Sequence, residues 1–155
     1  MSTRGFIERG GLWIAAQNTL TVAVLFLAPL FRGPWQGPVA TIVGIGLVGV
    51  GGWFGIGGVR ALGRNRTAYP MPLEDASLVQ HGVYAIVRHP LYSSLMFVSL
   101  GWTMWWGSWA GLAASAALTL VLNAKAVREE RWLRDRYPEY PSYEQRVKRF
   151  VPGVW

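Results

Sequence analysis

The sequence predicts an all-α, polytopic membrane protein with about four transmembrane helices. Of its 155 residues, 52% are hydrophobic and only 15% are charged, whereas soluble domains carry about 25% charged residues. The uncharged residues form long runs, and the basic residues flank those runs. A disordered chain is excluded, because that class combines low hydrophobicity with high charge. The length predicts a single domain over residues 1–155.

The first two expected spans cover residues 11–31 and 39–62. A helix needs about 20 apolar residues to cross the hydrocarbon core, and both runs reach that length. Arg60 is the only charged residue in either run, and it lies at the end of the second. The first run is longer than the 7–15 apolar residues of a cleavable signal peptide, so we expect an uncleaved helix.

The third uncharged stretch contains two spans. It runs from residue 91 to residue 124. One straight helix of that length would measure roughly 51 Å at ~1.5 Å per residue, far beyond the ~30 Å hydrocarbon core. Gly107 and Ser108 lie near its middle. We therefore expect two helices, 91–106 and 108–124, folded as a hairpin.

The distribution of Lys and Arg predicts the orientation. Fourteen of the fifteen basic residues, all except Arg32, fall on one side of the expected spans. Cytoplasmic loops carry an excess of Lys and Arg, so both termini are expected in the cytoplasm. Trp35, Trp105, Trp106 and Trp109 fall at the opposite face, as in an interfacial aromatic belt. The net charge of +7 therefore indicates topology, and we expect no nucleic-acid partner, which needs a solvated basic domain.

Glycines in the second span have the spacing of a dinucleotide-binding loop at residues 44–49. That motif requires a preceding strand and a helix N-terminus, and here it lies inside an apolar span. We expect these small residues, with Gly51, Gly55 and Gly58, to allow close helix packing. The same stripe would allow a helix–helix homodimer.

Metal binding is not expected. The chain has two His, at positions 81 and 89, and no Cys, which excludes a disulfide scaffold and a Cys-ligated metal site. Gln17 and Asn18 in the first span and Trp53 in the second are expected to serve packing, and a position facing a lipid cavity is the alternative for each.

Function is expected in two polar segments on the cytoplasmic side, 63–90 and 125–155. In the first, Arg88 and His89 immediately precede Pro90, which suits the first position of a helix. The free N–H groups of a helix N-terminus hold anions, and the Arg guanidinium fits a carboxylate. An ordinary helix start with a snorkelling Arg explains the same residues.

The second polar segment begins as an extension of the last span. Lys125 and Glu129, like Glu130 and Arg134, are spaced for i,i+4 pairs that support a helix. Its basic residues also suit an anchor to anionic lipid headgroups, at roughly 1 kcal/mol each. Neither explanation accounts for two adjacent carboxylates at the membrane boundary, which are suited to hold a cation or a ribose.

Together these elements resemble the integral-membrane methyltransferases, which include isoprenylcysteine carboxyl methyltransferase and the phospholipid methyltransferases. The matching elements are Gly82-x-Tyr84-x-x-x-Arg88-His89-Pro90-x-Tyr92, Glu129-Glu130-x-x-Leu133, Tyr140-x-x-Tyr143 and Arg146-Val147. The resemblance covers about residues 76–152, half of the chain. Sterol reductases share a related C-terminal domain but have many more spans.

The resemblance implies an enzyme that uses S-adenosylmethionine to methylate a lipid or isoprenylcysteine-like acceptor at the cytoplasmic membrane face. Residues 76–92 and 125–152 would bind the cofactor. The cofactor-binding residues implied in this way are Leu78, Val79, Tyr84, His89, Pro90, Tyr92, Glu129 and Glu130. The implied catalytic residues are Arg88, Glu129 and Lys125, the last at the position that faces the methyl acceptor.

Three positions depart from the family pattern. Lys125 stands where Arg is common, Ser94 where a Gly is usual, and Pro138 replaces a Gly before the final tyrosines. Two other function classes remain open. One is a non-enzymatic small membrane scaffold or transporter subunit, consistent with the glycine-rich spans. The other is a sterol-reductase-like protein that uses a nicotinamide cofactor.

Overall fold

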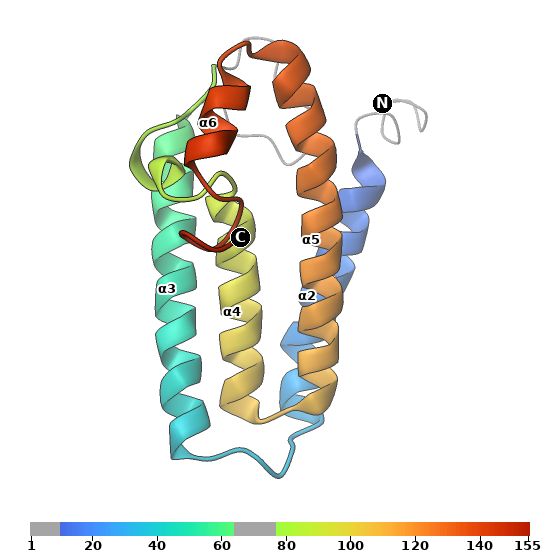
Figure 1. Cartoon of the computed structure of the whole chain (residues 1–155). Coiled ribbons are helices and arrows are strands. Elements are labelled where there is room, and N and C mark those ends of the chain that lie inside the picture. The colour runs from blue at the N-terminus through green and yellow to red at the C-terminus, as the bar shows by residue number, and fades with distance from the viewer. Residues whose placement is uncertain (1–9, 64–76) are drawn as a thin grey trace.

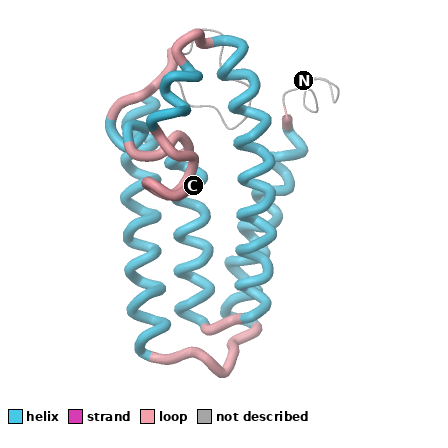
Figure 2. The backbone as a smooth tube through the Cα atoms, in the orientation of Figure 1, coloured by secondary structure: helices cyan, strands magenta, loops and turns pink. Residues whose placement is uncertain are grey.

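The computed structural model describes residues 10–63 and 77–155, and these residues are mainly helical (Figures 1 and 2). A short 3-10 helix, η2 (Gly82–Ala85), precedes the third long helix. In the described part of the chain the only extended pairing is an isolated bridge between Val87 and Lys148, and no strand is formed. The remaining elements are α2 (Gly11–Leu30), α3 (Pro38–Leu62), α4 (Pro90–Trp106), α5 (Trp109–Arg136) and α6 (Tyr140–Arg146).

The helix boundaries agree closely with the expected spans. Three helices, α2, α3 and α5, are long and apolar enough to cross a membrane. Helix α4 has 17 residues, which is at the lower limit for a spanning helix. Many of the large apolar side chains on these helices are exposed, among them Leu30, Val39 and Leu120 at over 70%. An exposed apolar surface of this extent marks contact with lipid.

The hairpin between α4 and α5 is built by two small residues. Gly107 ends α4 in the left-handed region, at φ 61°, which a residue with a Cβ rarely adopts. Ser108 then caps α5, since its side chain accepts a hydrogen bond from the Gly111 amide at 3.1 Å. The expected hairpin is therefore confirmed, and α5 continues without a break beyond residue 124 to Arg136.

Glycines on one face of α3 bring its backbone against α4, along which it packs (Figure 1). A Cβ added at Gly44 would lie 2.6 Å from the carbonyl oxygen of Gly101, and one at Gly51 would lie 2.9 Å from that of Ser94. Gly55 and Gly58 also face α4, whereas Gly46 has open space beside it. The expectation of close packing is therefore confirmed for Gly44, Gly51, Gly55 and Gly58 but not for Gly46 and Gly49, beside which no atom lies within 4 Å. The motif at 44–49 lies inside α3 and does not form the loop that dinucleotide binding requires.

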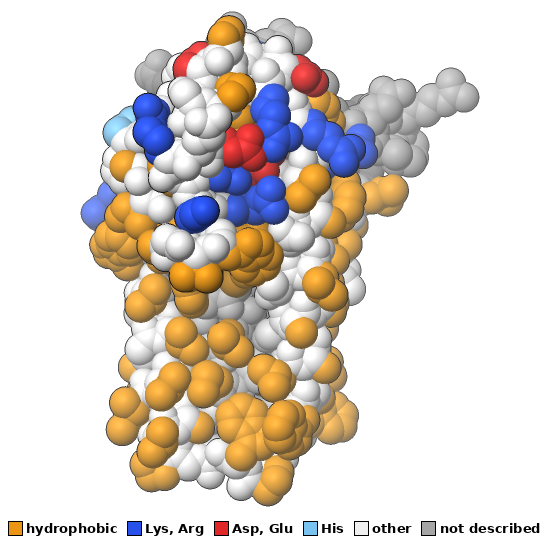
Figure 3. All heavy atoms as spheres, viewed as in Figure 1, with side chains coloured by type: hydrophobic (Ala, Val, Ile, Leu, Met, Phe, Trp, Pro, Cys, Tyr) orange, Lys and Arg blue, Asp and Glu red, His pale blue; other side chains and the backbone are white. Residues whose placement is uncertain are grey.

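Charged side chains gather at the end of the bundle that carries α6, while apolar side chains cover the lower part (Figure 3). The exception is Arg32, whose guanidinium lies 4.4 Å from the centre of the Trp106 ring in a cation–π contact. This separation agrees with the asymmetry of Lys and Arg in the sequence. Four of the basic residues used in that argument, Arg4, Arg9, Arg64 and Arg66, lie outside the described residues.

Candidate functional site

A cavity opens at the charged end of the bundle. It lies among the C-terminal end of α3, η2, the first turn of α4, the extension of α5 and the α6 segment. Its walls combine aromatic and aliphatic side chains with one Arg, one His and one Glu, the composition usual for small-molecule sites. The lining residues are Leu62, Ser77, Leu78, Val79, Tyr84, Arg88, His89, Leu91, Tyr92, Glu129, Leu133, Tyr137, Tyr140 and Tyr143.

The Arg88-His89-Pro90 element is fixed from two sides. Pro90 begins α4, as expected, because its ring suits the first helical turn and needs no hydrogen-bond partner. On the other side, the Arg88 amide donates to the Lys148 carbonyl at 2.8 Å and the His89 amide donates to the Arg149 carbonyl at 3.1 Å. The C-terminal segment therefore holds the backbone that presents Arg88 and His89.

Tyr92 connects the first turn of α4 to the carboxylate of Glu129 on α5. Its hydroxyl donates a hydrogen bond of 2.6 Å to Glu129 Oε2. Its ring stacks on His89, with 5.2 Å between centroids and 5° between planes. The Lys125 ammonium lies 5.0 Å from the same ring. Glu129 and the two rings thus form one continuous wall of the cavity.

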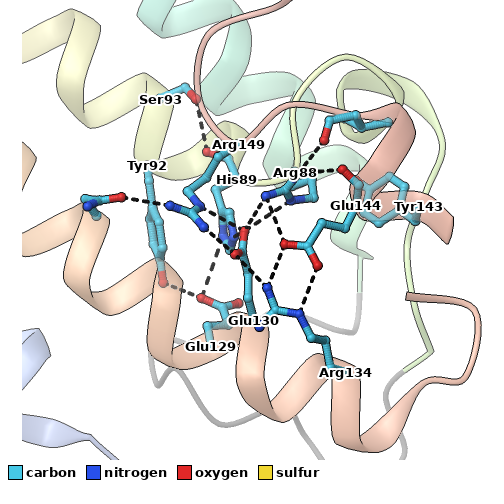
Figure 4. A network of polar contacts seen from close by, with 12 residues as sticks. Arg88, His89, Tyr92, Ser93, Glu129, Glu130, Arg134, Tyr143, Glu144 and Arg149 are labelled. Carbon is cyan, nitrogen blue, oxygen red and sulfur yellow. Dashed lines mark hydrogen bonds and ion pairs between the residues drawn. The ribbon is translucent and has the colours of Figure 1, made fainter. Parts of the chain in front are cut away.

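Glu130 lies behind that wall, fully buried, at the centre of a cluster of cations (Figure 4). Its Oε1 accepts from Arg88 Nη2 at 2.9 Å and lies 3.1 Å from His89 Nε2. Its Oε2 accepts from Arg149 Nη2 at 2.7 Å. A buried carboxylate is tolerated only when it is paired and hydrogen-bonded in this way. Arg134, at i,i+4, is 3.8 Å away.

Glu144 joins α6 to the same cluster. Arg134 donates to both of its carboxylate oxygens, at 2.9 and 2.6 Å, and Arg88 Nη2 lies 3.6 Å away. The hydrogen bonds from Arg134 lower the pKa of Glu144 below its ordinary value. Arg88 also donates to the Val147 carbonyl. These ion pairs and hydrogen bonds therefore hold α5, α6 and the segment between η2 and α4 together. They involve two carboxylates, of Glu130 and Glu144, and three guanidinium groups, of Arg88, Arg134 and Arg149.

Three tyrosines cover the cavity from the η2 and α6 side. Tyr143 donates a hydrogen bond of 2.6 Å to the Tyr84 carbonyl. Burial raises the pKa of Tyr84, Tyr140 and Tyr143, so all three phenols are neutral at physiological pH. The Tyr140 hydroxyl is buried and has no hydrogen-bond partner in the described structure. Because a buried hydroxyl without a partner is costly, Tyr140 is suited to bind a polar ligand group.

Most residues singled out in the sequence come together around the cavity. Three of them do not line it. Pro90 is buried in the helix start, Glu130 is behind the wall, and Lys125 lies beside the ring of Tyr92, which lines the cavity. The structure therefore separates the two adjacent carboxylates, and only Glu129 is in position to touch a ligand directly. The residues that line the cavity are Leu78, Val79, Tyr84, Arg88, His89, Tyr92 and Glu129.

Sequence reasoning missed Leu62 and Leu91, which complete the apolar side of the cavity. It also missed the roles of Arg149 and Glu144 in the cluster around Glu130. The sequence did not distinguish Arg149 as a site residue, since it belongs to a basic run that membrane topology already explains. No group of three or more potential metal ligands occurs within residues 10–63 and 77–155.

Comparison with known proteins identifies the family. The chain is 29% identical over 149 residues to the cobalt-zinc-cadmium resistance protein CzcN of Cupriavidus metallidurans, and the match covers 95% of this chain and 65% of that protein. It is 33% identical over 63 residues to an uncharacterized protein of Haemophilus influenzae, covering 39% of this chain and all of that protein. Residues 39–140 match the sequence profile of phospholipid methyltransferases. The chain therefore belongs to the phospholipid methyltransferase family.

Proposed function

We propose that the protein transfers a methyl group from S-adenosylmethionine to a lipid or lipid-linked acceptor at the cytoplasmic membrane face. Family membership supports methyl transfer in a membrane. The observation that carries the proposal is the position of the cavity, at the end of an apolar helix bundle, where it is lined by Glu129, Tyr92 and Tyr140. A water-soluble cofactor and a lipid meet most directly at such a boundary.

The donor groups of the cavity fit this cofactor. Glu129 supplies a carboxylate for the ammonium or the ribose hydroxyls, and Tyr140 supplies a hydroxyl that has no other partner in the described structure. Leu62, Leu78 and Val79 supply apolar surface for the adenine. Tyr aromatic faces attract a sulfonium through cation–π interactions. Among the described residues, Glu129 is the only carboxylate that lines this cavity.

Methyl transfer requires the protein to align the methyl donor with the acceptor, and it requires no nucleophile from the protein. When bound, the cofactor supplies an electrophilic methyl group whose bond to sulfur breaks with its electron pair left on sulfur, while the acceptor's lone pair forms the new bond. Holding both partners in line contributes roughly 7–11 kcal/mol in favourable cases. A carboxylate acceptor needs no base. An amine acceptor must release a proton, and Glu129 is the carboxylate within the cavity that can accept it.

The proposed topology has four spans, α2 to α5, with both termini in the cytoplasm. It is supported by the gathering of charge at the α6 end of the bundle (Figure 3). The 17 residues of α4 then cross as the shortest span. A cysteine-accessibility experiment tests this, since the chain has no Cys. A Cys at exposed Asp135 should react in inside-out vesicles, and a Cys at Gly37 in intact cells or right-side-out vesicles; the opposite pattern contradicts the topology.

The family relative CzcN is named for cobalt, zinc and cadmium resistance. That name does not lead us to propose a metal site in this chain, because the described residues hold no cluster of three metal ligands. A protein that methylates a membrane component can take part in metal resistance without binding a metal itself.

Calorimetry with purified protein in detergent tests the proposal. We expect S-adenosylmethionine to bind with a micromolar Kd, and the transfer of isotopically labelled methyl groups into a membrane lipid extract. Asp135→Asn, at an exposed position of α5 outside the cavity, is the control and should bind as the wild type does. Folded wild-type protein that shows neither heat nor transfer would overturn the proposal in favour of a non-enzymatic membrane role.

A further inference from the structure

A groove between α4 and α5 forms a second cavity, separate from the one that Glu129 lines. It runs along residues 93–100 of α4 and 112–119 of α5, which is roughly 10 Å at ~1.5 Å per residue. Its volume of about 290 Å³ is near the lower limit of roughly 300 Å³ for small-ligand sites. The two cavities share no lining residue, so the groove needs an explanation of its own.

Small side chains on α5 leave the groove unfilled. Ser115, Ala116 and Thr119 line one wall, and the larger Phe97 lies on the α4 wall. Helix α4 packs more extensively on α3 than on α5, and a hydrogen bond of 3.0 Å between Thr103 and Ser115 joins the two hairpin helices nearer the turn. Ala116 is exposed, so the groove opens to the surface of the bundle that contacts lipid.

The walls of the groove suit a hydrocarbon chain. Three hydroxyl groups line it, and each already has a hydrogen-bond partner in the described structure. Ser93 donates to the Phe150 carbonyl at 2.8 Å, Thr119 donates to the Ser115 carbonyl at 2.9 Å, and Ser115 pairs with Thr103. The other lining side chains are apolar. Because an unfilled void forfeits the dispersion contacts of its lining, a hydrocarbon chain in the groove would restore them.

Residues 149–151 cover the end of the groove that is nearest the charged cluster (Figure 1). Phe150 lines the groove, and its carbonyl accepts the hydrogen bond from Ser93 on α4 (Figure 4). On the other side, Arg149 Nη1 donates to Asn123 on α5 at 3.0 Å. This segment therefore bridges the two helices and places Arg149 directly beyond the apolar walls.

The charge at this end favours an anion. The cluster around Glu130 contains three guanidinium groups and two carboxylates, which leaves one positive charge, and Lys148 is exposed beside it. A guanidinium has five N–H donors, and Arg149 directs three of them at Glu130 and Asn123. Its side chain is 20% exposed. An anionic group attached to a chain in the groove would therefore meet a cation within reach.

We propose that the groove binds an anionic phospholipid, with one acyl chain between α4 and α5 and the phosphate at Arg149. This lipid is a bound ligand and not the methyl acceptor. His89 lines the cofactor cavity and Phe150 lines the groove, and their rings lie against each other with 5.9 Å between centroids. The chain would pack beneath Phe150 and support the segment whose carbonyls hold the Arg88 and His89 amides. The proposal does not depend on methyl transfer.

Native mass spectrometry of the detergent-purified protein, titrated with lipid, tests the proposal. We expect one molecule of dioleoylphosphatidylglycerol to bind at least tenfold more tightly than dioleoylphosphatidylcholine, which has the same chains and no net charge. Ala116→Phe fills the opening of the groove and should weaken binding of this lipid at least tenfold, and Ala116→Leu should have an intermediate effect. Ala113→Phe is the matched control, because Ala113 is exposed on the same helix but does not line the groove. It should bind as the wild type does.

Thermal unfolding in detergent gives a second readout. Dioleoylphosphatidylglycerol should raise the unfolding midpoint of the wild type and of Ala113→Phe by more than that of Ala116→Phe, because only the first two keep the groove open. A lipid that binds N and not the unfolded chain stabilises in this way. Equal shifts in all three proteins would show that the stabilising lipid lies elsewhere.

Three further outcomes would overturn the proposal. One is an unchanged lipid Kd in folded Ala116→Phe and Ala116→Leu, and another is equal affinity for the two lipids. The third is a wild-type dimer that Ala116→Phe dissociates while the lipid still binds, since the groove would then belong to a second copy of the chain. A wild type that binds the lipid as expected but does not bind S-adenosylmethionine would support this site while the proposed function fails.

Discussion

Glu129 and Glu130 are adjacent in sequence but occupy opposite sides of the cavity wall. Glu129 lines the cavity and accepts a hydrogen bond from Tyr92. Glu130 is fully buried and is surrounded by Arg88, His89 and Arg149. Consecutive residues on a helix point about 100° apart, so one carboxylate turns toward a ligand while the next turns into the protein. The two should respond very differently to the same substitution.

Glu129→Gln should weaken binding of S-adenosylmethionine about tenfold, or about 1.4 kcal/mol, with little effect on folding. The amide keeps the size and can still accept from Tyr92, but it loses the negative charge that a bound cation or ribose would use. Calorimetry measures the Kd, and circular dichroism confirms the helix content. An unchanged Kd in a folded variant would move the cofactor away from this carboxylate.

Glu130→Gln should instead destabilise the protein by about 3–5 kcal/mol, because it leaves the buried Arg88 and the half-buried Arg149 without their counter-charge. Thermal unfolding in detergent measures the effect. Asp135→Asn, on an exposed position of the same helix, should leave the midpoint within about 1 °C of wild type. A Glu130→Gln variant as stable as the wild type would show that the cluster around Glu130 is not what holds the C-terminal segment.

The order of the helices and the place of the site were predictable from local sequence, and the partners of each side chain were not. Apolar runs gave the helix limits, and Gly107 with Ser108 gave the hairpin, because both depend on neighbouring residues. The contact between Arg149 and Glu130 depends on how the chain returns over α5. The contact between Gln17 and Lys125 joins residues 108 positions apart. Neither pairing leaves a periodic signal in the sequence.

Tyr140→Phe and Tyr143→Phe should separate a ligand contact from a structural contact. The Tyr140 hydroxyl is buried without a partner in the described residues, so its removal should leave the unfolding midpoint of the ligand-free protein unchanged or raised, and weaken cofactor binding about three- to tenfold. The Tyr143 hydroxyl already donates to the Tyr84 carbonyl, so its removal should cost about 0.5–1.5 kcal/mol of stability. Equal loss of stability in both variants would contradict this assignment.

Acid should weaken the contact between α6 and α5. The hydrogen bonds from Arg134 lower the pKa of Glu144 from its ordinary value of 4.5, so the carboxylate stabilises the fold when ionised. This contribution is fully present above pH 4.5 and is lost as the pH falls through the lowered pKa of the folded state. Wild type should therefore be more stable than Glu144→Gln at pH 7, and the gap between their unfolding midpoints should close below pH 4.5. A gap that stays constant with pH would exclude Glu144 as the titrating group.

The packing of α3 on α4 should discriminate sharply between glycines of one helix. A methyl group at Gly44 would lie 2.6 Å from the Gly101 carbonyl oxygen, whereas one at Gly46 would meet no atom within 4 Å. Gly44→Ala should destabilise the protein by about 1–3 kcal/mol, because the backbones must separate. Gly46→Ala should leave stability unchanged or raise it slightly, since Ala favours a helix over Gly. Thermal unfolding of both variants tests this, and a Gly46→Ala variant that unfolds as readily as Gly44→Ala would place a second helix partner, such as another copy of the chain, on that face of α3.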